Sequence, residues 1–210
     1  MSHRPWLRLL SPATRAFVAE GRRLPGYSLW DGLHGYVYAR WTYLYIGLAS
    51  GDRPALRRLR AAAAAILRRL PRRQRSPDAP TFADAYHGKV VPLSAAAQLV
   101  TVEEDVNLGD LEQIIPYRLA REIVLQHPQR IVALDCPCRV GKTNPCLPLD
   151  VCLIVGEPFA SLVREHQPTR SRWITPHEAV EILQQEDARG HVHHAFFKDA
   201  MLGRFYAICN

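Results

Sequence analysis

A short segment rich in cysteine and proline constrains this chain more than any other part of its sequence. Four of the five cysteines lie within the 17 residues Cys136–Cys152, together with Pro137, Gly141, Pro145 and Pro148. Prolines interrupt helices, so this segment cannot form one long helix. A loop of this composition can instead bring its thiols to one point, and converging thiolates are the usual ligands of zinc ions and iron–sulfur clusters. The sequence therefore predicts a metal or cluster site here.

The spacing of these cysteines leaves the kind of metal open. Cys136, Cys138, Cys146 and Cys152 are separated by one, seven and five residues. Zinc loops usually contain paired C-x2-C knuckles, and bacterial ferredoxins contain a C-x2-C-x2-C-x3-C-P run, so the pattern departs from both. Free cysteines are often small buried core residues, but four in one short segment favour ligands. Iron–sulfur and zinc sites remain the two alternatives from spacing alone.

Several motifs resemble those of a known family. The stretches concerned are DCPCR, CLPLDVC with the following LIVG, ITPHEA, GHVH and the terminal ICN, at residues 135–139, 146–156, 174–179, 190–193 and 208–210. They are similar to a family of atypical ferredoxin-like proteins that bind [4Fe-4S] clusters, over about residues 114–210.

The resemblance implies that Cys136, Cys138, Cys146 and Cys152 hold one [4Fe-4S] cluster and that Cys209 is an additional thiol or a remnant of a second site. Any four of the five would also satisfy the chemistry. In that family further cysteines follow the ICN sequence, so we expect either a protein with one site or a chain that stops short of a second.

Two basic residues lie inside the cysteine segment. The charges of Arg139 and Lys142, together with loop amides, would offset the negative charge of a bound cluster and raise its reduction potential. No set of nucleophile, base and orienting group is evident, so we expect a non-catalytic electron carrier rather than an enzyme. Residues 141–143, Gly-Lys-Thr, lack the first glycine of a phosphate-binding loop, because that position is Cys136.

Hydrophobic periodicity predicts an α+β fold, mainly helical, with a small β component around the C-terminal Cys-rich metal-binding region. A polar, proline-bearing stretch after Leu70 indicates a linker. We therefore expect a helical N-terminal subdomain over residues 1–75 and a ferredoxin-like iron–sulfur subdomain over residues 81–210. Expected helices span residues 3–22, 27–49, 54–70, 114–126 and 175–188, and residues 93–100 are expected to be a short helical or irregular stretch. Expected strands span residues 130–134, 191–197 and 204–209.

Much of the net charge of +7 lies in and after the third expected helix. These arginines are candidate contacts for an acidic redox partner, for nucleic acid or for a membrane surface, although a solvated helix face is the commoner role. Nucleic acid is not favoured, because no aromatic residues are interleaved with the arginines. A redox-sensing regulator that binds nucleic acid here, and a zinc-stabilised interaction protein, are the alternative functions. The candidate residues are Arg57, Arg58, Arg68, Arg69, Arg72 and Arg73.

The remaining sequence features bear on location and on a second metal site. No apolar run is long enough for a transmembrane segment, and no signal peptide is evident, so the cytoplasm is expected. His191, His193 and His194 resemble a metal-binding tract, but alternation along a strand separates His194 from the other two. We interpret them as surface or hydrogen-bonded histidines.

Overall fold

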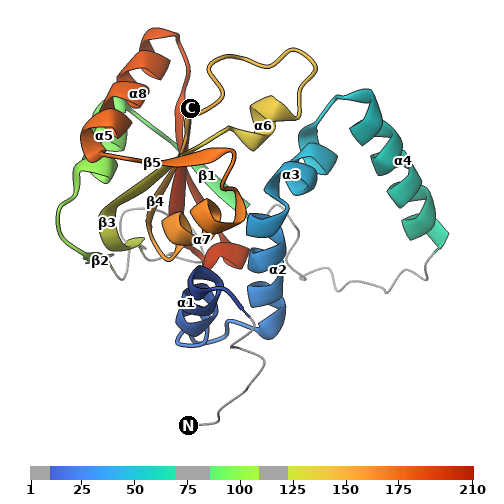
Figure 1. Cartoon of the computed structure of the whole chain (residues 1–210), viewed down its shortest axis with the longest axis horizontal. Helices are drawn as coiled ribbons and strands as arrows, with labels where there is room; N and C mark the ends of the chain where they lie inside the picture. Colours follow the sequence, from blue (N-terminus) through green and yellow to red (C-terminus); the bar gives the residue numbers. More distant parts are fainter. Residues whose placement is uncertain (1–9, 70–85, 109–122) are drawn as a thin grey trace.

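A seven-stranded antiparallel sheet forms the centre of the molecule (Figure 1). The computed structural model describes residues 10–69, 86–108 and 123–210. The strand order is β1-β6-β7-β4-β3-β2, with β5 also paired to β3. The strands are β1 (Tyr86–Val91), β2 (Val106–Leu108), β3 (Ile123–Leu134), β4 (Cys152–Glu157), β5 (Ser171–Ile174), β6 (His193–Lys198) and β7 (Arg204–Cys209).

Helices surround this sheet, so the predicted α+β class is confirmed, while the β component is larger than expected. The helices are α1 (Pro12–Gly21), α2 (Leu29–Arg40), α3 (Thr42–Ser50), α4 (Pro54–Arg69), α5 (Leu93–Thr101), α6 (Pro137–Val140), α7 (Phe159–His166), α8 (Pro176–Ala188) and the 3-10 helix η4 (Asp199–Met201).

Both faces of the sheet are covered, which explains the unbroken apolar run at the end of β3. Val132 and Leu134 belong to a core on the face covered by α1, α2 and α7, whereas Ile131 and Ala133 belong to a core on the face covered by α5 and α8. Successive strand residues point to opposite faces, so all four are buried. Figure 1 shows the two helical layers on either side of the strands.

Most of the predicted elements are present, with shifted ends. Strand 130–134 lies inside β3, the helix at 175–188 is α8, and the two C-terminal strands pair as β6 and β7. The expected helix 27–49 is divided into α2 and α3 at Trp41, whose backbone leaves the helical region at φ −125° and ψ 39°. Residues 3–9 of the first expected helix and the linker after Leu70 lie outside the described residues.

The expected helix 114–126 is wrong for its last four residues. Residues 123–126 belong to β3, where they pair with β2 and with Glu157 of β4; residues 114–122 lie outside the described part of the chain. His127 adopts a positive φ of 47°, and the register shifts between Gln126 and Ile131. This irregularity accommodates Pro128, which a regular central strand would exclude.

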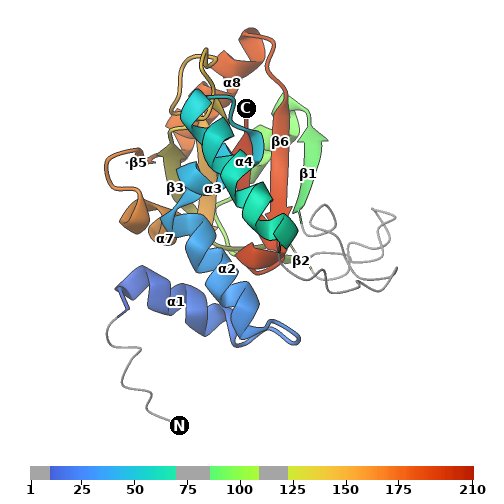
Figure 2. The ribbon, with the colours of Figure 1, turned by 90° about the vertical axis from the view of Figure 1, so that its right-hand side faces the viewer.

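Helix α4 lies at the outside of the molecule, beside α3 and away from the sheet (Figure 1), so it is in front of α3 in the view of Figure 2. Its Leu56 packs against α3, since a Cβ built on Gly47 would lie 3.0 Å from Leu56 Cδ1. Within the described residues, no helix combines the length and the apolar character needed to cross a membrane.

Candidate functional site

Four of the five cysteines line one cavity of about 50 Å³ at one end of the sheet: Cys136, Cys138, Cys152 and Cys209. Cys136 follows the last residue of β3 by two positions and precedes α6, which contains Cys138. Cys152 is the first residue of β4, and Cys209 is the last residue of β7. Because these neighbouring strands are antiparallel, the end of β3, the start of β4 and the end of β7 meet at the same edge.

The strand register brings two of these thiols face to face. Leu153 pairs with Ile208 and Ile154 pairs with Ala207. One further step of the same register sets Cys152 opposite Cys209, where side chains on adjacent strands are in contact range. Pairing of distant strands therefore brings Cys209 to the cysteine segment.

Hydrogen bonds among the thiols centre on Cys136. Its sulfur accepts hydrogen bonds from the thiols of Cys138 and Cys209 and from the backbone N–H groups of Arg139 and Cys138, which together hold the pKa of Cys136 well below its usual range. The same interaction with Cys136, together with burial, raises the pKa values of Cys138 and Cys209. Burial raises the pKa of Cys152. Of these four thiols, Cys136 is therefore the one whose pKa is lowered, while the pKa values of the other three are raised.

Cys146, the remaining predicted ligand, is exposed and does not line this cavity. Among the described residues, no group of three or more histidine, cysteine, aspartate or glutamate side chains stands ready to hold a metal ion. The structure therefore brings together Cys136, Cys138, Cys152 and Cys209, and leaves Cys146 outside this group.

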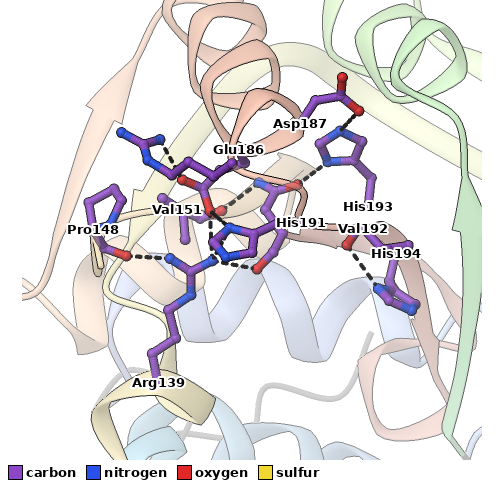
Figure 3. Close-up of polar contacts among 11 residues, drawn as sticks. Arg139, Pro148, Val151, Glu186, Asp187, His191, Val192, His193 and His194 are labelled. Atoms are coloured by element: carbon purple, nitrogen blue, oxygen red, sulfur yellow. Dashed lines mark hydrogen bonds and ion pairs between the residues drawn. The ribbon is translucent and has the colours of Figure 1, made fainter. Parts of the chain in front are cut away.

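Arg139 is buried beside the thiols and joins three segments of the chain (Figure 3). Its guanidinium donates to the carbonyl oxygen of Pro148 at 2.5 Å, to Glu186 Oε2 at 2.6 Å and to the carbonyl oxygen of Asn210 at 2.9 Å. Its positive charge opposes the rise in the pKa of Cys152. Arg139 thus fixes the cysteine loop to α8 and to the residue after Cys209.

Lys142, the other predicted tuning residue, lies at the surface of the loop. Its Nζ donates to the carbonyl oxygen of Ser50 at 3.0 Å and is 4.0 Å from a carboxylate oxygen of Asp52. Hydrogen bonding to Cys136 and burial raise the pKa of Cys138, and the charge of Lys142 opposes them. Lys142 therefore attaches the loop to the end of α3 while its charge reaches one thiol.

The histidines near β6 take part in hydrogen bonds rather than in a joint cluster (Figure 3). His191 Nδ1 is 2.6 Å from Glu186 Oε2, His193 Nδ1 is 2.6 Å from Asn210 Oδ1, and His194 Nδ1 is 3.2 Å from the carbonyl oxygen of Val192. Asn210 Nδ2 also donates to the carbonyl oxygen of Val151, next to Cys152. These contacts hold the ends of β4 and β7 together.

Sequence reasoning missed Glu186, which is fully buried. It lies on the same face of α8 as the buried residues Ala179 and Leu183, seven and three residues earlier. An acidic residue on an apolar helix face indicates a buried ion pair. In the structure the partner of Glu186 is Arg139.

Tyr38 of α2 and Tyr206 of β7 also line the thiol cavity. The hydroxyl oxygens of Tyr38 and Tyr206 are 3.0 Å apart, and both rings are buried. Lys198 Nζ lies 4.3 Å from the centre of the Tyr38 ring and 4.8 Å from that of Tyr45. Tyr38 and Tyr206 both belong to the core cluster on the face of the sheet covered by α1, α2 and α7.

The candidate partner-binding arginines are only partly described. Arg57 and Arg58 are exposed on α4. Arg68 and Arg69 end this helix, but their side chains lie outside the described part, as do Arg72 and Arg73.

The chain matches no protein-family model, no curated protein and no solved structure, so its membership of the ferredoxin-like family stays a prediction.

Proposed function

We propose that the chain holds a [4Fe-4S] cluster at Cys136, Cys138, Cys152 and Cys209 and serves as an electron carrier. The observation that carries the proposal is the shared cavity of these four thiols. Four cysteine thiolates are the standard ligand set of such a cluster. When bound, the cluster supplies one-electron transfer.

The surroundings of the thiols fit this ligand set. The other walls of the cavity are mainly apolar, and include Leu134, Ile154, Val163 and Phe196. Apolar walls limit solvent access, which is one of the factors that set a cluster's reduction potential. The backbone N–H groups of Cys138 and Arg139 point at the sulfur of Cys136, where they stabilise negative charge.

Loading would require the thiols to lose their protons. In the hydrogen-bonded arrangement Cys136 accepts from two neighbouring thiols, and metal binding releases such protons. The exposed position of Cys138, in contrast to buried Cys136, leaves one edge of the site near the surface, where a redox partner would dock.

The test is anaerobic purification followed by visible and electron paramagnetic resonance spectroscopy and by iron, sulfide and zinc analysis. We expect about four irons and four sulfides per chain. Cys209→Ser should abolish or damage the cluster, while Cys146→Ser, the matched control, should retain it.

Other results would each overturn part of the proposal. Loss of the cluster in Cys146→Ser but not in Cys209→Ser would reject this ligand set in favour of the four cysteines between 136 and 152. A colourless protein with one zinc ion per chain would instead identify a zinc-stabilised interaction protein.

A further inference from the structure

Exposed large apolar side chains are concentrated on one part of the molecule. Among the described residues eleven such side chains are exposed, and seven of them lie on α2, on α4 or between α2 and the end of α3. The seven are Leu29, Trp30, Leu33, Trp41, Leu44, Leu59 and Ile66. Single exposed apolar residues are ordinary, whereas a concentration of this kind marks an interaction surface.

On α2 the exposed apolar residues form a stripe directed away from the protein. Leu29, Trp30 and Leu33 lie on one side of the helix at spacings of one, three and four residues. Gly35 and Tyr38, on the other side, are buried against the core. Trp30 is 77% exposed, so this indole contributes little to the fold.

Helix α4 carries a second stripe together with positive charge. Leu59 and Ile66 are seven residues apart and therefore lie on the same face; they are 47% and 63% exposed. Arg58 is exposed on the flank of this face, and Arg57 is exposed on the opposite side of the helix. Leu56 lies on the same face, three residues before Leu59, and packs on α3, so the start of this face is attached to the protein while Leu59 and Ile66, farther along the helix, are exposed.

Positively charged residues outnumber negatively charged ones in this region. Residues 29–69 contain seven arginines and two acidic residues, Asp31 and Asp52. Both carboxylates are engaged locally: Asp31 accepts from the backbone N–H of Ser28 at 2.9 Å, and Asp52 accepts from that of Thr143 at 2.7 Å. Neither carboxylate contacts Arg57 or Arg58, and these two exposed arginines can interact with an external partner of negative charge.

We propose that α2, α3 and α4 form a peripheral binding surface for an anionic lipid bilayer. An amphipathic helix with arginines beside leucine and isoleucine has the composition of helices that lie in the membrane interface. Tryptophans prefer the same interface, and arginines near anionic headgroups add attraction. The acyl region of a bilayer can bury apolar side chains that lie apart from one another, because it needs no complementary shape. Nucleic acid would leave the exposed leucines without an apolar partner.

Vesicle flotation of the full-length protein tests this surface. The vesicles contain phosphatidylserine and phosphatidylcholine in equal parts, or phosphatidylcholine alone, at low and high salt. We expect the wild type to bind the anionic vesicles preferentially and to lose binding as salt rises. Arg57→Glu/Arg58→Glu should weaken binding about tenfold or more, and Leu59→Ser/Ile66→Ser should also weaken it.

Matched variants outside the surface separate these effects from general changes. Arg15→Glu/Arg22→Glu makes the same charge change on α1 and at its C-cap, and Val90→Ser/Val192→Ser removes exposed apolar residues elsewhere. Both double variants should bind as the wild type does. Circular dichroism verifies that each variant is folded. The proposal would be overturned if the wild type did not bind vesicles, or if it bound neutral and anionic vesicles equally. It would also be overturned if either α4 variant bound as strongly as the wild type. The outcome does not depend on whether a cluster is bound.

Discussion

Lys198 is a buried lysine whose ammonium lies among aromatic rings. Its side chain is 2% exposed and stacks over Tyr38 and Tyr45. Burial disfavours the charged form and lowers the pKa of Lys198 from 10.5 to about 8, although Asp199 opposes the shift. Below pH 8 both the folded and the unfolded protein carry the charge, so the folded state bears the full cost of burying it.

Lys198→Met should therefore stabilise the protein relative to the wild type at neutral pH. A shift of this size corresponds to about 3 kcal/mol in the free energy of unfolding, reduced by the loss of the contacts with the rings. Between pH 8 and 10.5 the folded lysine is neutral while the unfolded one still binds a proton, so the destabilisation caused by the buried charge decreases as the pH rises. The advantage of the variant should shrink over this window. Urea denaturation of both proteins at several pH values measures it, and a difference that stays constant from pH 7 to 10.5 would contradict the argument.

Single residues also mark the limit of what the sequence predicts about the site. The cysteine segment was identified because four thiols lie close together in the chain. The role of Cys209 depends on β4 and β7 lying side by side, which brings it opposite Cys152. No local pattern encodes that pairing of segments more than 50 residues apart.

Close packing of α2 on η4 sets a strict limit on side-chain size at Gly35. A Cβ at this position would lie 2.1 Å from the carbonyl oxygen of Ala200 and 2.6 Å from Phe17 Cζ. Both neighbours are buried, and one is backbone, so neither moves easily.

Gly35→Ala should lower the free energy of unfolding by about 2 kcal/mol or more, because the helix must shift away from η4. Gly32→Ala is the matched control on the same helix, since its new Cβ would be 3.7 Å from the nearest atom, in the Tyr27 ring. There we expect a gain of up to about 1 kcal/mol from helix propensity. Urea denaturation measures both variants, and equal effects at the two positions would show that α2 does not pack as described.

Elements with strong local signals were predictable, and those set by distant partners were not. Helix α8 begins where Thr175 accepts from the backbone N–H of Glu178 and Pro176 follows, a local capping sequence that agrees with the expected start at residue 175. Residues 123–126 have a pattern that also suits a helix, and their strand conformation depends on β2 and β4. The His127-Pro128 pair follows directly after the expected helix 114–126, where proline would end a helix, but in the structure it lies inside a strand irregularity.

At the scale of the whole molecule, the N-terminal helices share one core with the sheet. Phe17 and Tyr38, from the predicted helical subdomain, pack in the same cluster as Val132, Ile154 and Tyr206. A boundary near residue 75 was inferred from linker composition, which carries no information on how the two parts pack. The shared core leads us to expect that the described parts of the chain unfold together.

A buried ion pair provides the sharpest test of this cooperativity. Glu20, at the end of α1, accepts from Arg204 Nη1 of β7 at 2.8 Å and from Gln126 Nε2 of β3 at 3.2 Å. Both charged side chains are about nine-tenths buried, and the Nε of Arg204 has no hydrogen-bond partner among the described residues. Loss of the carboxylate would leave the guanidinium buried without its counter-charge.

Glu20→Ala should therefore lower the free energy of unfolding by about 3 kcal/mol, since an unpaired buried charge is costly. Glu181→Ala is the matched control: its side chain is 52% exposed and lies 3.6 Å from an exposed histidine, so its effect should stay below about 0.5 kcal/mol. Thermal unfolding followed by far-UV and near-UV circular dichroism measures both variants. In the wild type and in Glu20→Ala the two signals should change in one coincident transition, because α1 and the sheet share their core. Two separate transitions, with only one of them shifted by Glu20→Ala, would instead establish that the N-terminal helices and the sheet fold as independent units.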